Sequence, residues 1–254
     1  MKQKLIDFLI CPTCRKSVDV KIRKKRGSEI IDGLIKCRQC NDVFKITKGI
    51  PRFVVDDTKD FVKTEYAFSE KWKKHHKNHQ KKDWVDFQRK WFLDRYGWGT
   101  KENFDKFLES KNMILDAGTG IGNSAKFLST NKKSEVIALD ASESIDFAYE
   151  KYGKLPNVHF LQADLRQLPF KKSFFDYIYS DQVLHHTKNT GTSFKYLTKF
   201  LQLVDISLSM FIIKKLQLEN MLMIIFEIKR LKCQLLNVLN FLNKWHFWVK
   251  AYQN

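Results

Sequence analysis

The sequence predicts an α/β protein in which a small cysteine-rich module precedes a doubly wound sheet of parallel strands. Three observations predict this fold class. Four of the five cysteines form two CxxC pairs before residue 41. Four short apolar runs between residues 112 and 181 each end on or near an acidic residue, as expected for parallel strands with carboxylates at one sheet edge. Segments of helical character separate the first three runs, and alternation of strand and helix is typical of βαβ units.

The composition is that of a globular chain with a strong positive charge. Its 254 residues contain 46 Lys and Arg against 28 Asp and Glu, which gives a formal net charge of +18. Clustered cations can bind nucleic-acid phosphates, but here most of the excess is spread along the chain. Two denser clusters, KIRKKRG from Lys21 and KWKKHHKNHQKK from Lys71, are interpreted as solvated faces. RNA is therefore the second choice of acceptor.

Hydropathy gives no indication of membrane attachment. No uncharged apolar run approaches the roughly 20 residues that a membrane helix needs, and the most apolar region, residues 206–228, contains four charged side chains. The apolar run near the start is short and is interrupted by Asp7, unlike a secretory signal peptide. We therefore expect a cytoplasmic protein that does not bind membranes.

The two cysteine pairs predict a structural zinc site. Cys11 with Cys14, and Cys37 with Cys40, each have the spacing that wraps two thiolates around one ion. A redox dithiol is disfavoured because two pairs occur and no thioredoxin-like elements surround them. Four reduced thiols in a core are the remaining alternative, but so small a module has too small a hydrophobic core to fold without a disulfide or a metal ion. Four protein ligands leave no open position for a substrate.

The residues around these pairs resemble a known module. FLICPTC, followed by IIDGLIKCRQCNDVFKITKGIPRFV, is similar to the zinc ribbon related to the small activator subunit of tRNA and protein methyltransferases. The similarity spans about residues 5–55 and includes the GIP that follows the second pair. It implies a zinc-ribbon domain over residues 1–56, of a kind often fused ahead of a methyltransferase in bacterial proteins.

A glycine-rich loop gives the first indication of a cofactor. In NMILDAGTGIGNSAKFL an apolar run reaches Asp116 and turns through Gly118, Gly120 and Gly122 into a helix. A nicotinamide-binding loop, GxGxxG, would need its third glycine at the position of Asn123. ILDAGTGIG instead resembles motif I of class I S-adenosylmethionine-dependent methyltransferases, of the type 11-like kind.

The resemblance implies roles for this loop. Its glycines let the backbone approach the methionine part of the cofactor, whose carboxylate meets amide donors near a helix start. Asp116 orients the loop and lies near the cofactor's ammonium group.

The next two acidic strand ends match the same family. SEVIALDAS ends its apolar run on Asp140, about 20 residues after the loop, where a carboxylate can accept ribose hydroxyls, with Ala141 beside it. The alternative for Asp140 is an N-cap of the following helix, and it can serve as both. In VHFLQADLRQLPF the resemblance implies that Asp164 accepts from the adenine amino group while the Leu165 amide faces a ring nitrogen.

A fourth strand resembles the family's motif IV. SFFDYIYSDQVLHHT contains an apolar run that ends near Ser180, a further cofactor contact by resemblance, and the VLHH that follows is typical of the motif. The similarity covers about residues 60–200 and implies a Rossmann-like methyltransferase core over residues 112–200. His185 and His186 follow this strand and are the candidate catalytic bases, with helix capping or packing as the alternative role.

The segment between the two regions, residues 57–111, is predicted to be a helical cap rich in aromatic and basic residues. Three of its aromatic residues are candidates for a lid over the cofactor or substrate, and packing onto the sheet is an equal alternative. His75 and His79 are one helical turn apart, but no third metal ligand accompanies them. The three candidate lid residues are Tyr66, Phe68 and Trp72.

The tail, residues 201–254, departs from the family. From Thr192 onward there is no glycine or proline, so we expect a sheet that is incomplete at its C-terminal strands. A shifted reading of the codons for residues 203–211 can encode a Gly-Gly turn and a strand. We therefore hypothesise a frameshift near residues 200–203, which the gene's nucleotide sequence tests. The alternative is a native helical tail for dimerisation or partner binding.

Taken together, the motifs predict a methyltransferase that transfers a methyl group from S-adenosylmethionine to a small-molecule acceptor, with structural Zn²⁺ in the ribbon. Two alternatives stay open. One is a truncated or frameshifted protein that binds the cofactor without turnover. The other is an NAD oxidoreductase, which the glycine spacing disfavours. The sequence does not identify the acceptor or the oligomeric state.

Overall fold

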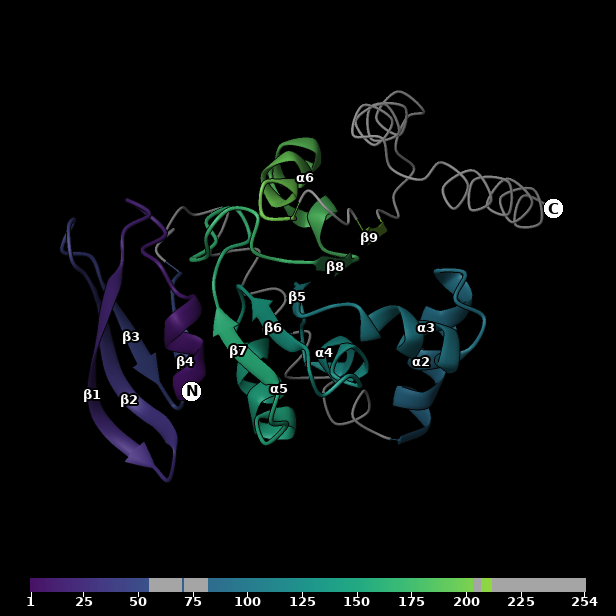
Figure 1. The fold of residues 1–254 in the computed structure, drawn as a ribbon, viewed down its shortest axis with the longest axis horizontal. Helices are drawn as coiled ribbons and strands as arrows, with labels where there is room; N and C mark the ends of the chain where they lie inside the picture. Colours follow the sequence, from purple (N-terminus) through teal and green to yellow (C-terminus); the bar gives the residue numbers. More distant parts are fainter. Residues whose placement is uncertain (55–69, 71–81, 203–206, 212–254) are drawn as a thin grey trace. The chain divides into compact units, whose positions relative to one another are not determined.

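The computed structural model describes residues 1–54, 70, 82–202 and 207–211, all of which lie in one compact unit, Met1–Ile212. The described strands form one nine-stranded sheet in the order β1-β2-β3-β4-β7-β6-β5-β8-β9 (Figure 1). The boundary predicted at residue 56 lies outside the described residues, as do Tyr66, Phe68, Trp72, His75 and His79.

The ribbon, residues 1–54, begins with a short 3-10 helix and continues as an antiparallel meander. Strand β3 alternates exposed and buried residues, as a strand with one face on a core should. Ile30 and Ile35 of β2 and Phe44 and Ile46 of β3 are buried. The elements are η1 (Gln3–Phe8), β1 (Val18–Arg26), β2 (Glu29–Cys37), β3 (Val43–Thr47) and β4 (Ile50–Arg52).

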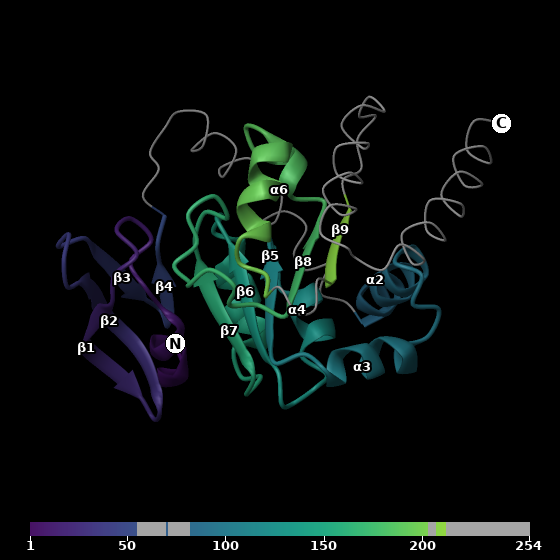
Figure 2. The same ribbon diagram turned by 45° about the horizontal axis from the view of Figure 1, so that its top comes forward.

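The ribbon is joined to the rest of the sheet through β4. Arg52 of β4 pairs with Gln162 of β7 in the parallel sense, and the Phe53 amide donates to the Gln162 carbonyl at 2.7 Å. The antiparallel meander therefore continues directly into the parallel sheet (Figure 2). The sequence predicts the ribbon and the sheet as consecutive modules, and the structure adds that they share a hydrogen-bonded edge.

The remaining elements form the doubly wound part. Helices α2 and α3 come before β5, and the Thr100 side chain caps α3 by accepting from the Asn103 amide at 3.3 Å. The elements are α2 (Lys82–Arg95), α3 (Lys101–Glu109), β5 (Met113–Ala117), α4 (Asn123–Leu128), β6 (Glu135–Asp140), α5 (Ser144–Tyr152), β7 (Val158–Gln162), β8 (Tyr177–Asp181), η2 (Leu184–His186), α6 (Thr190–Thr198) and β9 (Ser207–Phe211).

Strands β7, β6, β5, β8 and β9 run parallel, and side chains on both faces of the inner strands are buried. One face carries Ile114, Val136 and Tyr179, which share a core with residues of α2, α3, α4 and α5. Alternate residues such as Leu115 and Ile137 point to the other face. Helix α6 lies between β8 and β9 in the chain, and Figure 1 shows it on the opposite side of β8 from α4. The predicted doubly wound α/β class is confirmed.

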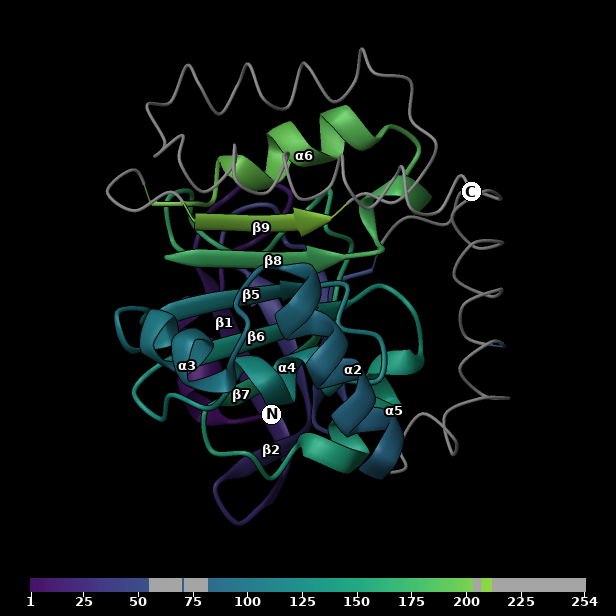
Figure 3. The ribbon, with the colours of Figure 1, turned by 90° about the vertical axis from the view of Figure 1, so that its right-hand side faces the viewer.

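Strand β9 corrects one expectation. The lack of glycine and proline after Thr192 argues against a fifth strand, yet Ser207–Phe211 pairs in parallel with β8 along its whole length (Figure 3). A helix-to-strand connection needs only a few loop residues and no tight turn, so the missing glycines do not prevent it. The strands that would complete the sheet beyond residue 211 fall outside the described residues.

None of the helices that the structure describes has both the length and the apolar character needed to cross a membrane.

Candidate functional site

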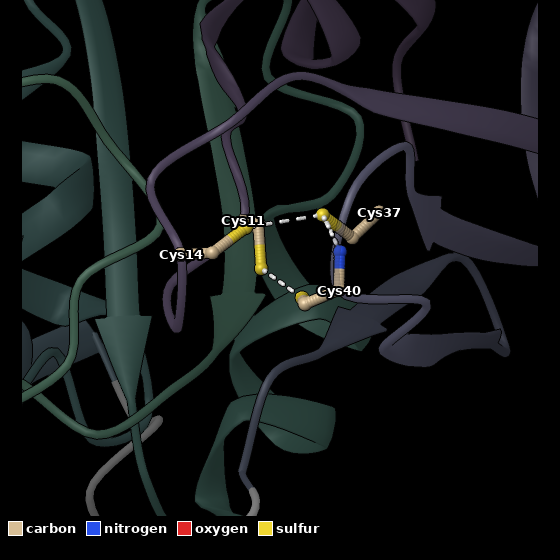
Figure 4. Close-up of side chains that lie close together, drawn as sticks. All are labelled: Cys11, Cys14, Cys37 and Cys40. Atoms are coloured by element: carbon tan, nitrogen blue, oxygen red, sulfur yellow. Dashed lines mark hydrogen bonds between the residues drawn. The ribbon is translucent and has the colours of Figure 1, made fainter.

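The four ribbon cysteines converge as the sequence predicts. Cys11 and Cys14 come from the turn before β1, Cys37 is the last residue of β2, and Cys40 lies in the turn between β2 and β3. All four sulfur atoms lie within 4.8 Å of one another (Figure 4). Two sulfur pairs are closer, with Cys11 to Cys40 at 3.5 Å and Cys14 to Cys37 at 3.3 Å.

This arrangement fits a tetrahedral zinc ion. With zinc–sulfur bonds of about 2.3 Å, the sulfurs of a tetrahedral site lie about 3.8 Å apart. The backbone amides of Gln39 and Cys40 point to the Cys37 sulfur at 3.3 and 3.5 Å. The Gln39 amide contributes most to lowering the pKa of the Cys37 thiol, to about 6, and so favours the thiolate that binds metal. The donor set is therefore compatible with metal binding.

The three loop glycines all take left-handed backbone conformations, with φ of 91° at Gly118, 56° at Gly120 and 85° at Gly122. Glycine is favoured in this conformational region because glycine has no Cβ. The Gly118 and Thr119 amides donate to the Leu139 carbonyl of β6 at 2.8 and 2.9 Å. These hydrogen bonds hold the loop against β6 at the carboxyl edge of the sheet, where open α/β proteins bind their ligands.

Asp116 is buried at this edge, with 1% of its surface exposed. Its Oδ2 accepts from the Ser124 hydroxyl of α4 at 2.7 Å. Burial raises the pKa of its carboxyl to about 7, and the charges of Asp140 and Asp181 also raise it, while the Ser124 hydrogen bond opposes this shift. A cation placed beside Asp116 would therefore remove a strong penalty on its ionised form.

The Asp140 carboxylate forms hydrogen bonds with the glycine loop and with the residues that follow β6. Its Oδ2 accepts from the Gly120 amide at 2.8 Å, and its Oδ1 accepts from the Ser142 amide at 2.9 Å and hydroxyl at 2.7 Å. Helix α5 has Glu143 as its N-cap, so Asp140 is not the cap residue. A carboxylate has about four acceptor sites. The three contacts to Gly120 and Ser142 leave one on Oδ2 for a further donor.

Asp164 and Leu165 lie two and three residues past the end of β7, and both are buried. The Asp164 carboxylate accepts from the Arg166 amide at 2.8 Å and from the Arg166 guanidinium, with Nε at 2.8 Å from Oδ2. Among the residues that the structure describes, no backbone carbonyl accepts from the Leu165 amide. The Arg166 contact is absent from the sequence prediction, and the local DLR pattern could have suggested it.

Ser180 and Ala141 have backbone-directed contacts. The Ser180 hydroxyl donates to the Ala117 carbonyl at 2.9 Å and so ties β8 to the end of β5. The Ala141 carbonyl accepts from the Gln162 side chain at 2.8 Å. Their roles toward a cofactor stay predictions.

His185 and His186 form the short helix η2 directly after β8. Their rings lie 3.9 Å apart between centroids, with His185 half-buried and His186 exposed. The N-cap of α6 is Asn189, whose side chain accepts from the Thr192 amide at 2.8 Å. Proton transfer by either histidine stays a prediction.

Helix α2 adds charged and aromatic residues that the sequence prediction missed. Arg95 places Nη2 at 3.7 Å from Asp181 Oδ1, with both side chains largely buried, and stacks on the Trp91 ring at 4.4 Å. Gln88 accepts from the Asn123 side chain at 2.7 Å, next to the glycine loop. The inner face of α2 therefore borders the site.

Comparison with known proteins finds similarity to methyltransferases. Residues 114–210 match the model of a family described as "Methyltransferase domain", so the match starts in β5 and ends in β9. A phosphoethanolamine N-methyltransferase 1 of Triticum aestivum is 30% identical over 106 residues, which is 41% of this chain and 21% of that protein. A malonyl-[acyl-carrier protein] O-methyltransferase of Legionella pneumophila is 29% identical over 90 residues, 35% of this chain and 32% of that protein.

Among solved structures, a SAM dependent methyltransferase from Aquifex aeolicus is 21% identical, with a TM-score of 0.41 over 53% of this chain and 79% of the other. The chain spans about a fifth to a third of the length of the curated relatives that it matches. Residues 114–210 of this chain are therefore similar to a methyltransferase domain, and their strands belong to the doubly wound, Rossmann-like sheet.

Proposed function

We propose that this chain transfers a methyl group from S-adenosylmethionine to a small-molecule acceptor. The observation that carries the proposal is the carboxyl edge of β5, β6 and β7, where a left-handed glycine loop lies between Asp116 and Asp140 and Asp164 follows β7. These acids match, in order, the groups of the cofactor that need acceptors. The methyltransferase family match over residues 114–210 supports the same assignment.

The adenosine half would lie over β6 and β7. The remaining acceptor site on Asp140 Oδ2 suits one ribose hydroxyl. The Leu165 amide suits a ring nitrogen of adenine, and Asp164 its amino group, which would share that carboxylate with Arg166. Each contact pairs a donor with an acceptor, so the residues fit this ligand.

The methionine half would lie over the glycine loop. At Gly118 and Gly122 an added Cβ would lie 2.3 Å from a Val183 methyl carbon and 2.9 Å from a Tyr152 ring carbon, so the loop is packed on its protein side too tightly for a side chain. Ammonium beside Asp116 would favour the ionised carboxylate, whose pKa burial raises to about 7.

When bound, S-adenosylmethionine supplies a methyl group already activated by its sulfonium. The chain's part is then to align the acceptor and to take up its proton. His185 is the first candidate for that proton, because it follows β8 at the switch point between β5 and β8 and is shielded in part from solvent. His186 is the second.

A small molecule is preferred over RNA for two reasons. The two curated relatives carry names that specify phosphoethanolamine and an acyl-carrier-protein-bound malonyl group as their substrates. In the ribbon, two of the five cations of the basic strand β1 lie 4.0 Å from acids, Arg23 beside Asp32 and Arg26 beside Glu29. We also propose that Cys11, Cys14, Cys37 and Cys40 hold one structural Zn²⁺, a role supported by their mutual spacing.

The test uses methyl-labelled S-adenosylmethionine and the full chain. Purified protein is incubated with separate pools of amines, carboxylic acids and total RNA, and label in each pool is counted after removal of the cofactor. Label in a low-molecular-weight pool is the expected result. Label in RNA alone would overturn the acceptor class. Binding of S-adenosylhomocysteine without transfer to any pool would instead support the alternative of a protein that binds the cofactor without turnover.

A further inference from the structure

The ribbon turn that contains Cys11 and Cys14 forms hydrogen bonds with the segment that follows Asp164. The Ile10 amide donates to the Pro169 carbonyl at 2.9 Å, and Arg15 Nη1 donates to the Leu168 carbonyl at 2.6 Å. The second terminal nitrogen of Arg15 donates to the Phe170 carbonyl. Three consecutive carbonyls of the core therefore receive hydrogen bonds from the ribbon, beginning four residues after Asp164.

Arg15 is held for this contact by the cysteine turn itself. Its φ of 66° is left-handed, which is uncommon for a residue other than glycine. The Arg15 amide donates to the Cys11 carbonyl at 3.0 Å, and the Cys11 amide donates to the Lys16 carbonyl at 2.8 Å. The turn that gathers Cys11 and Cys14 thus also directs the guanidinium toward the core.

A second arginine of the ribbon, Arg52, is linked by hydrogen bonds to the loop of Asp140 and Ala141. Arg52 of β4 forms a two-pronged pair with Asp146 in the first turn of α5, at 2.9 and 2.8 Å, and donates to Gln162 Oε1 at 2.9 Å. Gln162 in turn donates to the Ala141 carbonyl, next to Asp140. The Arg52 side chain is 19% exposed, so this network is partly shielded from water.

We propose that Arg15 and Arg52 are positioning residues for the adenosine half of the cofactor. Arg15 orders the segment after Asp164 and Leu165, and Arg52 orders the loop of Asp140 and Ala141 through Gln162 and Asp146. Loops ordered before binding cost less entropy when the ligand arrives. The inference rests on the proposed function, because it names what holds that same site.

The experiment compares dissociation constants of S-adenosylhomocysteine and of adenosine by calorimetry. Arg15→Asn removes the guanidinium and keeps a residue that tolerates the left-handed turn, and Arg52→Met keeps an apolar stem. Each is expected to weaken both ligands by about tenfold, the size of a lost charge-assisted hydrogen bond. Arg23→Gln, on the exposed strand β1, is the matched control and should change neither constant.

Amide hydrogen exchange shows which loop loses order in each variant. In the ligand-free protein, amide hydrogen exchange should rise at residues 164–170 for Arg15→Asn and at residues 140–146 for Arg52→Met. Zinc content and melting temperature are measured for each variant. Should either variant fail to fold, Arg15→Lys and Arg52→Lys replace it, since one ammonium reproduces only part of a forked contact, and a severalfold loss is then expected.

The outcomes separate this inference from the proposed function. Failure of the unchanged protein to bind S-adenosylhomocysteine would overturn the proposed function itself. Normal binding by the unchanged protein, with unchanged affinity in folded Arg15 and Arg52 variants, would overturn only the positioning role. A loss confined to S-adenosylhomocysteine, with adenosine unaffected, would also overturn it, because the two loops face the adenosine half.

Discussion

Gly118 and Val183 are in such close contact that a Cβ added at Gly118 would lie 2.3 Å from Val183 Cγ2. The contact joins the glycine loop after β5 to the turn after β8, across the point where the sheet changes winding direction. The two segments that resemble motifs I and IV are thus packed against each other without room for one methyl group.

Gly118→Ala should therefore disturb both the loop and the turn. We expect a loss of about 1–3 kcal/mol in the free energy of unfolding, from the clash and from the φ of 91°, and at least tenfold weaker S-adenosylhomocysteine binding. Denaturant titration and calorimetry measure these. Gly97→Ala is the matched control, because Gly97 has a φ of 71° but nothing within 4 Å of its Cβ position.

A second substitution tests the cause. If the clash with Val183 is responsible, Val183→Ala should recover part of the loss in the Gly118→Ala background. Losses that simply add in the double variant would point to the backbone conformation alone.

Asp116 should make stability depend on pH. Its folded-state pKa of about 7 lies above the ordinary value of 3.8, so the native state binds more protons than the unfolded state between these values. The free energy of unfolding should then fall as pH rises from about 4 to about 7 and level off above. Asp116→Asn should flatten this slope, whereas Asp94→Asn, at an exposed position of α2, should preserve it.

Cofactor binding provides a second readout of Asp116. If the ammonium group lies beside this carboxyl, binding near pH 6 should release a proton, which calorimetry in buffers of different ionisation enthalpy detects. Uptake of a proton, or no change, would place the ammonium elsewhere.

The cysteine cluster should bind one zinc ion per chain. Cys40→Ser should remove most of the bound zinc and lower the melting temperature, because a site that closes a small ribbon contributes to its folding. Metal analysis and thermal unfolding measure both. Cys233→Ser, outside the two pairs, should keep full zinc content. Zinc retained at one equivalent in Cys40→Ser would contradict the four-thiolate site.

Replacement of the histidines should separate proton transfer from packing. We expect His185→Ala to lower kcat by about 10²-fold or more with little change in S-adenosylhomocysteine affinity, because general bases act on the chemical step. His186→Ala, at the exposed position, should have a smaller effect. A lower melting temperature with unchanged kcat for His185→Ala would assign it to packing.

The apolar runs with acids at their ends were sufficient to predict β5, β6, β7 and β8 in order, because buried parallel strands have few alternatives in sequence. The cysteine spacing likewise predicted the cluster, since each CxxC pair is a local turn. Local patterns therefore located the strands, the glycine loop and the four thiols.

Contacts between distant segments could not be predicted in this way. The pairing of Arg52 with Asp146 joins residues 94 positions apart, and Arg15 reaches Leu168 across 153 positions. No periodicity in the chain specifies such partners, because they depend on how the ribbon docks along β7. Strand β9 was missed for another reason, as the absence of turn residues says little about a loop of several residues.

Calorimetric titration of the full chain with S-adenosylhomocysteine, beside NAD⁺ and with Asp140→Ala for comparison, tests which cofactor the glycine loop binds. We expect one binding site per chain for S-adenosylhomocysteine, none for NAD⁺, and at least tenfold weaker binding in Asp140→Ala, where the ribose acceptor and the Gly120 contact are both lost. Binding of NAD⁺ in place of S-adenosylhomocysteine, or binding unaffected by Asp140→Ala, would contradict the proposed cofactor site.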